Sequence, residues 1–164
     1  MPRVTTTRIL ADKVLQKTCG QECVDWAISM LDEGHDGECL SRLWGMVSPF
    51  NHFEVASLRD HALAELGIPD FTPSVALSRY AKELLRAGLT GEIRLTDALA
   101  TVKDLCIADD SQCDLFNFDL LFFAYDDLLD GEFTYHWPGA TRDNILEIIR
   151  QRAEAFVCEQ DPNA

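Results

Sequence analysis

The segment from Asp114 to Asp130 constrains the fold most strongly, because it is the most apolar stretch of the chain and contains no glycine, proline, lysine or arginine. Arranged as a helix, at about 100° per residue, it gathers its bulky side chains into one broad sector. A helix with such a sector packs that side against a core. The sector is formed by Asn117, Phe118, Leu121, Phe122, Tyr125, Leu128 and Leu129.

The opposite side of this predicted helix carries carboxylates around an aromatic ring. Asp119, Asp126 and Asp130 fall within about 40° of one another. Phe123 lies among them, and Phe116 is close by. Two interpretations are open. Either both phenylalanines are buried against a neighbouring helix while the carboxylates reach water, or they form an exposed aromatic anchor with an acidic rim, which is the composition of a surface that binds a basic protein.

Residues 132–138 follow with a different periodicity. Phe133, Tyr135 and Trp137 alternate with polar residues, which is typical of an extended chain. Since no second strand-like run lies nearby to pair with it, the segment predicts a short strap over the helices, closed by a turn at Pro138 and Gly139. Its aromatic side chains either fill the end of a core or extend the acidic surface.

The rest of the chain predicts further amphipathic helices. Asn51 with Glu54, and Thr72 with Pro73, are strong helix-start signals. The fold class is therefore all-α: a bundle of about seven to eight amphipathic helices in one domain over residues 1–164, and any sub-boundary falls near 88–91, where Gly88 and Gly91 interrupt the pattern. The remaining helices are expected near 7–18, 22–33, 38–47, 51–66, 72–88, 96–110 and 141–157.

The net charge of −14 is unevenly distributed. Residues 1–90 hold nine Lys/Arg and twelve Asp/Glu, whereas residues 91–164 hold five and sixteen. Such a field repels nucleic acid and anionic membranes and attracts cationic proteins. The N-terminal residues lack the apolar core of a secretion signal, and no apolar run has membrane-spanning length, so the expected location is the cytoplasm.

The six cysteines are expected to be reduced thiols in that compartment. Cys19 and Cys23 have C-x3-C spacing, which matches neither a zinc ribbon nor a CxxC redox pair. Cys106 and Cys158 are predicted to be small core residues, and Cys113 lies among aspartates that disfavour a thiolate. Trp44 is predicted to be a core aromatic.

Nucleotide-binding, serine-hydrolase and zinc-protease motifs are absent from the sequence. We therefore assign no catalytic residue, no metal ligand and no cofactor. The prediction is a non-enzymatic module that binds a basic protein, most concretely a bacterial immunity or antitoxin protein that inhibits a cationic toxin. The residues assigned to this acidic-aromatic surface are Phe116, Asp119, Phe123, Asp126, Asp127, Asp130, Tyr135 and Trp137.

Two alternatives come from other functional classes. The exposed aromatics could instead drive self-association into a structural or adaptor homodimer. The chain could also be a helical enzyme that holds its substrate between helices near His61 or His136.

Overall fold

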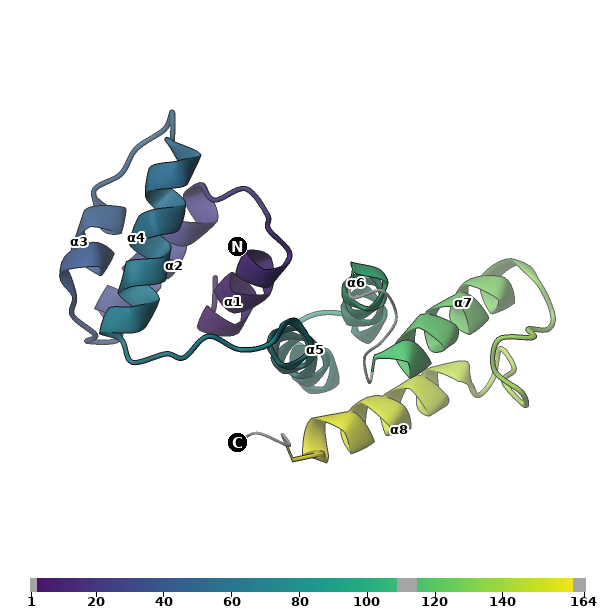
Figure 1. Ribbon diagram of the computed structural model, residues 1–164. Helices are drawn as coiled ribbons and strands as arrows, with labels where there is room; N and C mark the ends of the chain where they lie inside the picture. The colour runs from purple at the N-terminus through teal and green to yellow at the C-terminus, as the bar shows by residue number, and fades with distance from the viewer. Residues whose placement is uncertain (1–2, 109–114, 161–164) are drawn as a thin grey trace. The chain divides into compact units, whose positions relative to one another are not determined.

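The computed structural model describes residues 3–108 and 115–160, and this part of the chain contains eight helices and no strand (Figure 1). The prediction of an all-α fold with a non-helical strap near 132–138 is confirmed. None of the helices in these ranges combines the length and apolarity needed to cross a membrane. The helices are α1 (Thr6–Val14), α2 (Gln21–Asp32), α3 (Glu38–Trp44), α4 (His52–Glu65), α5 (Pro73–Thr90), α6 (Leu95–Ala108), α7 (Phe116–Asp130) and α8 (Ile145–Cys158).

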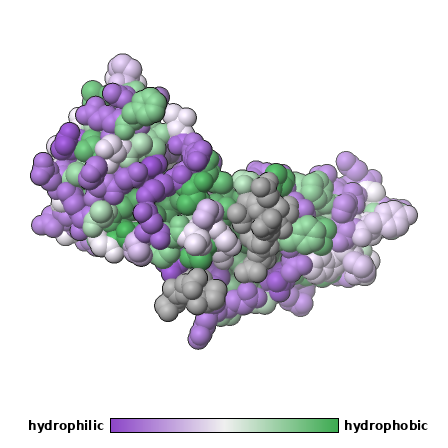
Figure 2. Space-filling view, viewed as in Figure 1, coloured by the Kyte–Doolittle hydropathy of each residue, from purple (hydrophilic) through white to green (hydrophobic). Residues whose placement is uncertain are grey.

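The chain divides into two compact units, Met1–Thr72 and Pro73–Ala164. Residues 88–91, where the sequence suggested a sub-boundary, instead form the end of α5 and the turn after it. The assignment of residues 1–164 to a single domain stays a prediction. In Figure 2, hydrophilic side chains on the visible face are interspersed with hydrophobic ones.

In the first unit, α2 packs against α1 and α3, and α3 packs against α4. Trp26 on α2 is fully buried, and its indole Nε1 donates a hydrogen bond to Thr6 Oγ1 at 3.0 Å. This bond ties the centre of α2 to the first turn of α1. The predicted cap of α4 is confirmed, since the Asn51 side chain accepts a hydrogen bond from the backbone N–H of Glu54.

The prediction that Trp44 is a core residue is wrong, because its side chain is 62% exposed. Helix α3 ends at Trp44 and has only two turns, which place Leu40 and Leu43 in the core. Trp44 follows Leu43 and so points about 100° away from that buried side.

In the second unit, each helix packs against two others in a closed circuit: α5 with α6 and α8, α6 with α7, and α7 with α8. The centre contains an edge-to-face pair formed by Phe118 of α7 and Phe156 of α8, with ring centroids 5.3 Å apart. Both rings are buried. Phe118, Leu121 and Leu128 of the predicted apolar sector of α7 are buried, together with Ala124, whereas Leu129 of that sector is exposed.

Gly88 does not end α5, as the sequence suggested, because the helix continues to Thr90. A Cβ atom at Gly88 would lie 3.0 Å from Leu95 Cδ1 and 3.1 Å from Leu95 Cα. The glycine therefore allows α6 to approach α5 closely. The turn comes at Gly91, which has a φ of +83°.

The two cysteines predicted to lie in the core differ. Cys106 is buried in α6, which confirms the prediction, but Cys158 is exposed at the end of α8. Cys158 lies two residues after the buried Phe156 and hence about 200° around the helix from it. Cys113 lies outside the described residues.

Candidate functional site

The two phenylalanines on the acidic side of α7 are accessible to solvent. Phe116 is 47% exposed and Phe123 is 38% exposed. The interpretation that both are buried against a neighbouring helix is therefore wrong. Phe123 is partly supported by its neighbours, since its ring packs edge-to-face on Phe122 with a centroid distance of 5.6 Å.

The carboxylates around Phe123 have three different environments. Asp126 and Asp130 are exposed and form no hydrogen bond or ion pair with other described residues. Asp119 is half-buried, and its Oδ1 accepts no hydrogen bond from the part of the chain that the structure describes. Asp127 instead binds the strap. Only part of the acidic rim therefore consists of carboxylates without an internal partner.

The strap folds back on α7 through polar contacts. Thr134 is buried, and its hydroxyl donates to Asp127 Oδ2 at 2.8 Å. The same hydroxyl accepts a hydrogen bond from the backbone N–H of His136 at 3.1 Å. The His136 ring then lies over Phe123, with 5.5 Å between ring centroids. Asp127 thus positions the strap beside Phe123.

The aromatic side chains of the strap point mainly outward. Tyr135 is 85% exposed and Phe133 is 58% exposed, and the two rings pack edge-to-face at a centroid distance of 4.4 Å. Trp137 is half-buried. The interpretation that these aromatics fill a core is wrong for Phe133 and Tyr135, because it is the polar Thr134 that points inward to reach Asp127.

Two basic side chains near this surface are occupied by other contacts. Arg142 Nε donates to the backbone carbonyls of Leu128 and Gly131, both at 2.9 Å, and so satisfies carbonyls at the C-terminus of α7. Lys103 Nζ lies 4.6 Å from the centroid of the Phe122 ring. Neither cation neutralises the exposed carboxylates of Asp126 and Asp130.

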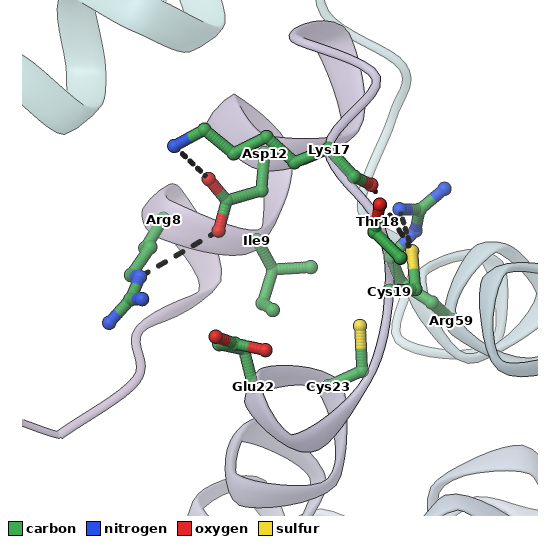
Figure 3. Close-up of a pocket in the computed structure, with 9 residues that line it drawn as sticks. All are labelled: Arg8, Ile9, Asp12, Lys17, Thr18, Cys19, Glu22, Cys23 and Arg59. Carbon is green, nitrogen blue, oxygen red and sulfur yellow. Dashed lines mark hydrogen bonds and ion pairs between the residues drawn. The ribbon is translucent and has the colours of Figure 1, made fainter. Parts of the chain in front are cut away.

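A second candidate site, which the sequence analysis missed, is a cavity of about 160 Å³ in the first unit (Figure 3). Its lining includes two thiols, those of Cys19 and Cys23, and the Arg59 guanidinium. Asp12 on the same wall forms ion pairs with Arg8 at 3.7 Å and Lys17 at 2.9 Å. The cavity therefore combines sulfur atoms with a dense set of charges.

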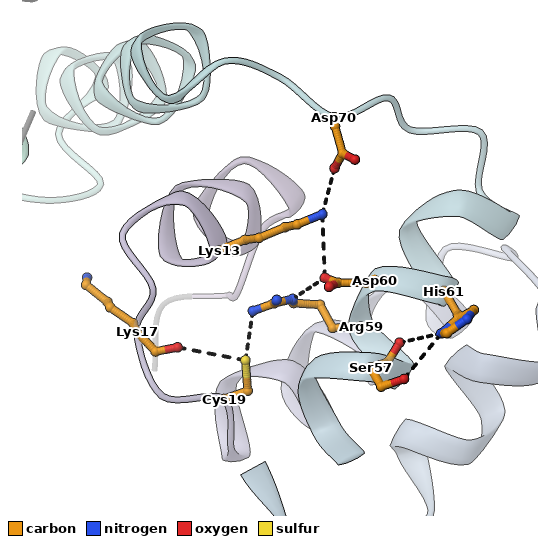
Figure 4. Close-up of polar contacts among 8 residues, drawn as sticks. All are labelled: Lys13, Lys17, Cys19, Ser57, Arg59, Asp60, His61 and Asp70. Atoms are coloured by element: carbon orange, nitrogen blue, oxygen red, sulfur yellow. Dashed lines mark hydrogen bonds and ion pairs between the residues drawn. The ribbon is translucent and has the colours of Figure 1, made fainter. Parts of the chain in front are cut away.

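Arg59 connects this cavity to α4. Its side chain is buried, with Nε donating to Asp60 Oδ1 at 2.9 Å and Nη1 donating to Cys19 Sγ at 2.7 Å (Figure 4). Burial alone would lower the pKa of the guanidinium, but the hydrogen bond to Asp60 and the nearby Cys19 sulfur raise it. Arg59 therefore stays charged inside the unit.

The surroundings of Cys19 fix its backbone as well as its sulfur. His52 Nδ1 hydrogen-bonds the backbone carbonyl of Cys19, which accepts. Cys19 Sγ also lies 3.8 Å from the carbonyl oxygen of Lys17, to which its thiol donates. Cys23 is buried beside it, and burial, followed by the nearby Cys19 sulfur, raises the pKa of Cys23 to about 12.

The C-x3-C spacing is visible in the sequence, but no signal points to Arg59, which lies 40 residues after Cys19, on α4. His61, near which the enzyme alternative would hold its substrate, is exposed and hydrogen-bonds the Ser57 carbonyl one turn earlier at 2.7 Å. In residues 3–108 and 115–160, no group of three or more His, Cys, Asp or Glu side chains is placed to hold a metal ion.

Comparison of the chain with protein-family models, with curated proteins and with solved structures finds no match. Function is therefore inferred from two places: the acidic-aromatic surface, and the cavity lined by Cys19, Cys23 and Arg59, which we call the thiol cavity.

Proposed function

We propose that the acidic-aromatic surface binds a basic partner protein, and that this binding is the function of the chain. The observation that carries the proposal is the exposure of Phe123 beside Asp126 and Asp130, two carboxylates with no partner among the described residues. An accessible aromatic ring supplies binding energy when a partner covers it. Surrounding carboxylates select and orient a cationic partner.

The distribution of charge supports a cationic partner. The unit of residues 73–164 holds eight Lys/Arg and seventeen Asp/Glu, for a net charge of −9. Arg142 and Lys103 lie close to the surface but are directed to backbone carbonyls and to the Phe122 ring. A long-range negative field accelerates encounter with a positively charged protein.

The most concrete form of this proposal is an immunity or antitoxin protein of the bacterial cytoplasm. Its target would be a cationic toxin, such as a nuclease, whose basic substrate groove normally receives phosphates. The carboxylates of Asp126 and Asp130 would take the positions of those phosphates, and the bulk of the second unit would block access. Inhibition would then combine electrostatic capture with steric occlusion.

The test is a pull-down with the tagged protein at low and high salt, followed by mass spectrometry of the bound proteins. We expect a basic protein that is retained at low salt and weakened at high salt. The double variant Asp126→Lys with Asp130→Lys should lower its recovery by about tenfold or more, because charge reversal repels the partner.

A matched control distinguishes the effect of charge reversal at the acidic-aromatic surface from the effect of the changed net charge. Glu147 and Glu154 are exposed acids on α8, so reversing both to lysine changes the net charge by the same amount as the double aspartate variant. The control should retain the partner. Equal loss in both double variants, or no loss in either, would contradict binding through the acidic-aromatic surface.

Self-association is a second candidate, favoured by the exposed ring pair of Phe133 and Tyr135. Two copies could bury these rings against each other. Light scattering at micromolar concentrations should then detect a dimer, and Tyr135→Ser should convert it to a monomer. A wild-type protein that is strictly monomeric removes this candidate.

A further inference from the structure

The thiol cavity lies in the first unit and has no role in the partner binding proposed for the acidic-aromatic surface. We propose that Cys19 and Cys23 form a redox-active pair, in which Cys19 reacts with a hydroperoxide such as hydrogen peroxide and Cys23 then closes a disulfide. The proposal is carried by the contact between Arg59 and Cys19 and by the position of both sulfurs on one cavity (Figure 3).

Arg59 provides the electrostatic setting for a reactive sulfur. A buried guanidinium needs anionic partners, and its carboxylate partner Asp60 also lies 3.6 Å from Lys13 Nζ. The Cys19 sulfur occupies a second donor, Nη1, at 2.7 Å. This cationic donor can stabilise negative charge on the sulfur and on the departing peroxide oxygen during the reaction.

The cavity gives a small oxidant access to this sulfur. Its volume is about 160 Å³, whereas a water molecule in the liquid takes up about 30 Å³. Hydrogen peroxide therefore fits beside Cys19, and its oxygens can accept hydrogen bonds from the cationic side chains on the wall. Cys19 itself is only 7% exposed, which protects it from larger reagents.

Position in the chain distinguishes the two cysteines. Cys19 lies in the loop before Gly20, the N-cap of α2, whereas Cys23 lies in the first turn of that helix. A loop residue followed by glycine can change its backbone and side-chain torsions more easily than a helical residue can. Cys23 keeps its proton at neutral pH, because burial and the Cys19 sulfur raise its pKa to about 12. Cys19 is therefore the first nucleophile and Cys23 the second.

The reaction balances without another reactant. The Cys19 thiolate attacks one peroxide oxygen, so that an S–O bond forms, the O–O bond breaks, and the departing hydroxide takes up a proton to become water. Cys23 then loses its proton and its sulfur attacks the Cys19 sulfenic acid, forming the S–S bond and breaking the S–O bond as a second water leaves. Overall, two thiols and one hydroperoxide give a disulfide, with the peroxide reduced.

Disulfide formation would change contacts beyond the two cysteines. As its sulfur turns towards Cys23, Cys19 gives up the hydrogen bond from Arg59, which leaves the guanidinium with Asp60 alone. The α1–α2 loop thereby loses one of its links to α4. The remaining link shown by the structure is the hydrogen bond between His52 and the Cys19 carbonyl. The oxidation state of the two cysteines is thus coupled to the contacts between the α1–α2 loop and α4.

The experiment treats the reduced, folded, full-length protein with equimolar hydrogen peroxide and follows each cysteine by peptide mass spectrometry. We expect a Cys19–Cys23 cross-link with loss of two hydrogen atoms, formed about tenfold or more faster than oxidation of Cys39 or Cys158. Cys23→Ser should instead accumulate a Cys19 sulfenic acid, which dimedone labels when the treated protein is unfolded in its presence. Arg59→Lys should slow the reaction of Cys19 by about tenfold, because a lysine does not reproduce the guanidinium contact.

Cys39→Ser is the matched control, since Cys39 is more accessible than either paired cysteine but has no guanidinium hydrogen bond to its sulfur. This variant should form the Cys19–Cys23 link at the wild-type rate. Faster oxidation of Cys39 or Cys158 than of Cys19 in the wild-type protein would overturn the proposal. So would a reaction of Cys19 that is unchanged in a folded Arg59→Lys variant. Circular dichroism checks the fold of each variant, and the comparison within the wild-type protein requires no substitution.

Discussion

Replacing Gly88 by alanine tests the close approach of α5 and α6. In an open helix this change stabilises, because alanine has a higher helix propensity than glycine by about 1 kcal/mol. In α5 the new methyl group would meet Leu95 Cδ1 at 3.0 Å, Leu95 Cα at 3.1 Å and Ala98 Cβ at 3.2 Å. Leu95 Cδ1 can rotate away, but Leu95 Cα belongs to the backbone of α6. The whole helix must therefore shift to relieve the contact.

The two effects have opposite signs, and the structure indicates which is larger. Inserting a methyl group into a packed core typically costs about 1–3 kcal/mol. Subtracting the propensity gain of about 1 kcal/mol leaves an expected loss on the order of 1 kcal/mol. The free energy of unfolding is measured by urea denaturation followed by circular dichroism, with the transition of the second unit fitted by itself if the two units unfold separately.

Gly45→Ala is the control for replacing glycine by alanine at a position without crowding. Gly45 has a φ of −80°, and its Cβ would meet the carbonyl oxygens of Arg42 and Ser41 at 3.7 and 3.8 Å, which are ordinary contacts. This variant should be neutral or stabilised by up to about 1 kcal/mol. If Gly88→Ala is stabilised as much as Gly45→Ala, the reasoning about helix packing is refuted. Ala98→Gly removes one of the crowded contacts, so it should cost less in the Gly88→Ala background than in the wild-type protein, as a double-mutant cycle measures.

Two further predictions concern the first unit. Thr6→Val leaves the buried indole N–H of Trp26 without its acceptor and should lower the free energy of unfolding by about 1–3 kcal/mol. Thr6→Ser keeps the hydroxyl and should cost less. Equal losses in urea denaturation would show that the hydrogen bond is unimportant. Cys23→Ala should reduce the alkaline loss of stability. The folded thiol keeps its proton until about pH 12 while the unfolded thiol loses it near 9.0, so the wild-type protein loses stability across that window. Unfolding under reducing conditions from about pH 8 to about pH 11 should give a shallower slope for the variant, and identical slopes would contradict the linkage.

Much of the helical framework could be predicted because helix signals are local. Helix α4 begins directly after its predicted cap Asn51, and α5 begins at Pro73, as the helix-start signals indicate. Most of the buried side of α7 belongs to the apolar sector that periodicity predicts. Gly88 shows where local rules stop. A glycine that ends a helix and a glycine that admits a neighbouring helix are the same residue in the sequence, and the difference lies with Leu95 of α6.

In both candidate sites, too, some features follow from local sequence signals and others depend on contacts between distant segments. The acidic side of α7 follows from periodicity, but the exposure of Phe123 depends on which segments cover it, and periodicity does not contain that information. The strap was predicted to extend over the helices, yet its attachment through Thr134 to Asp127 requires knowledge of where the chain turns back. The contact between Arg59 and Cys19 joins α4 to the loop between α1 and α2, which share no periodic signal, so the sequence alone offered no reason to connect them.

The residues of the acidic-aromatic surface differ in their contacts within the chain, and the proposed partner binding would therefore depend on them in different ways. Asp127 holds the strap through Thr134, so reversing its charge would disturb the surface itself as well as its potential. Asp126 and Asp130 are exposed and carry their charge without such a role. Exposed charges of this kind contribute about 0–1 kcal/mol each to a contact and act mainly on the association rate. A buried aromatic anchor often contributes more than about 1 kcal/mol. For the proposed partner we therefore expect Phe123→Ala to change mainly the dissociation rate, and charge reversal at Asp126 and Asp130 to change mainly the association rate and its salt dependence.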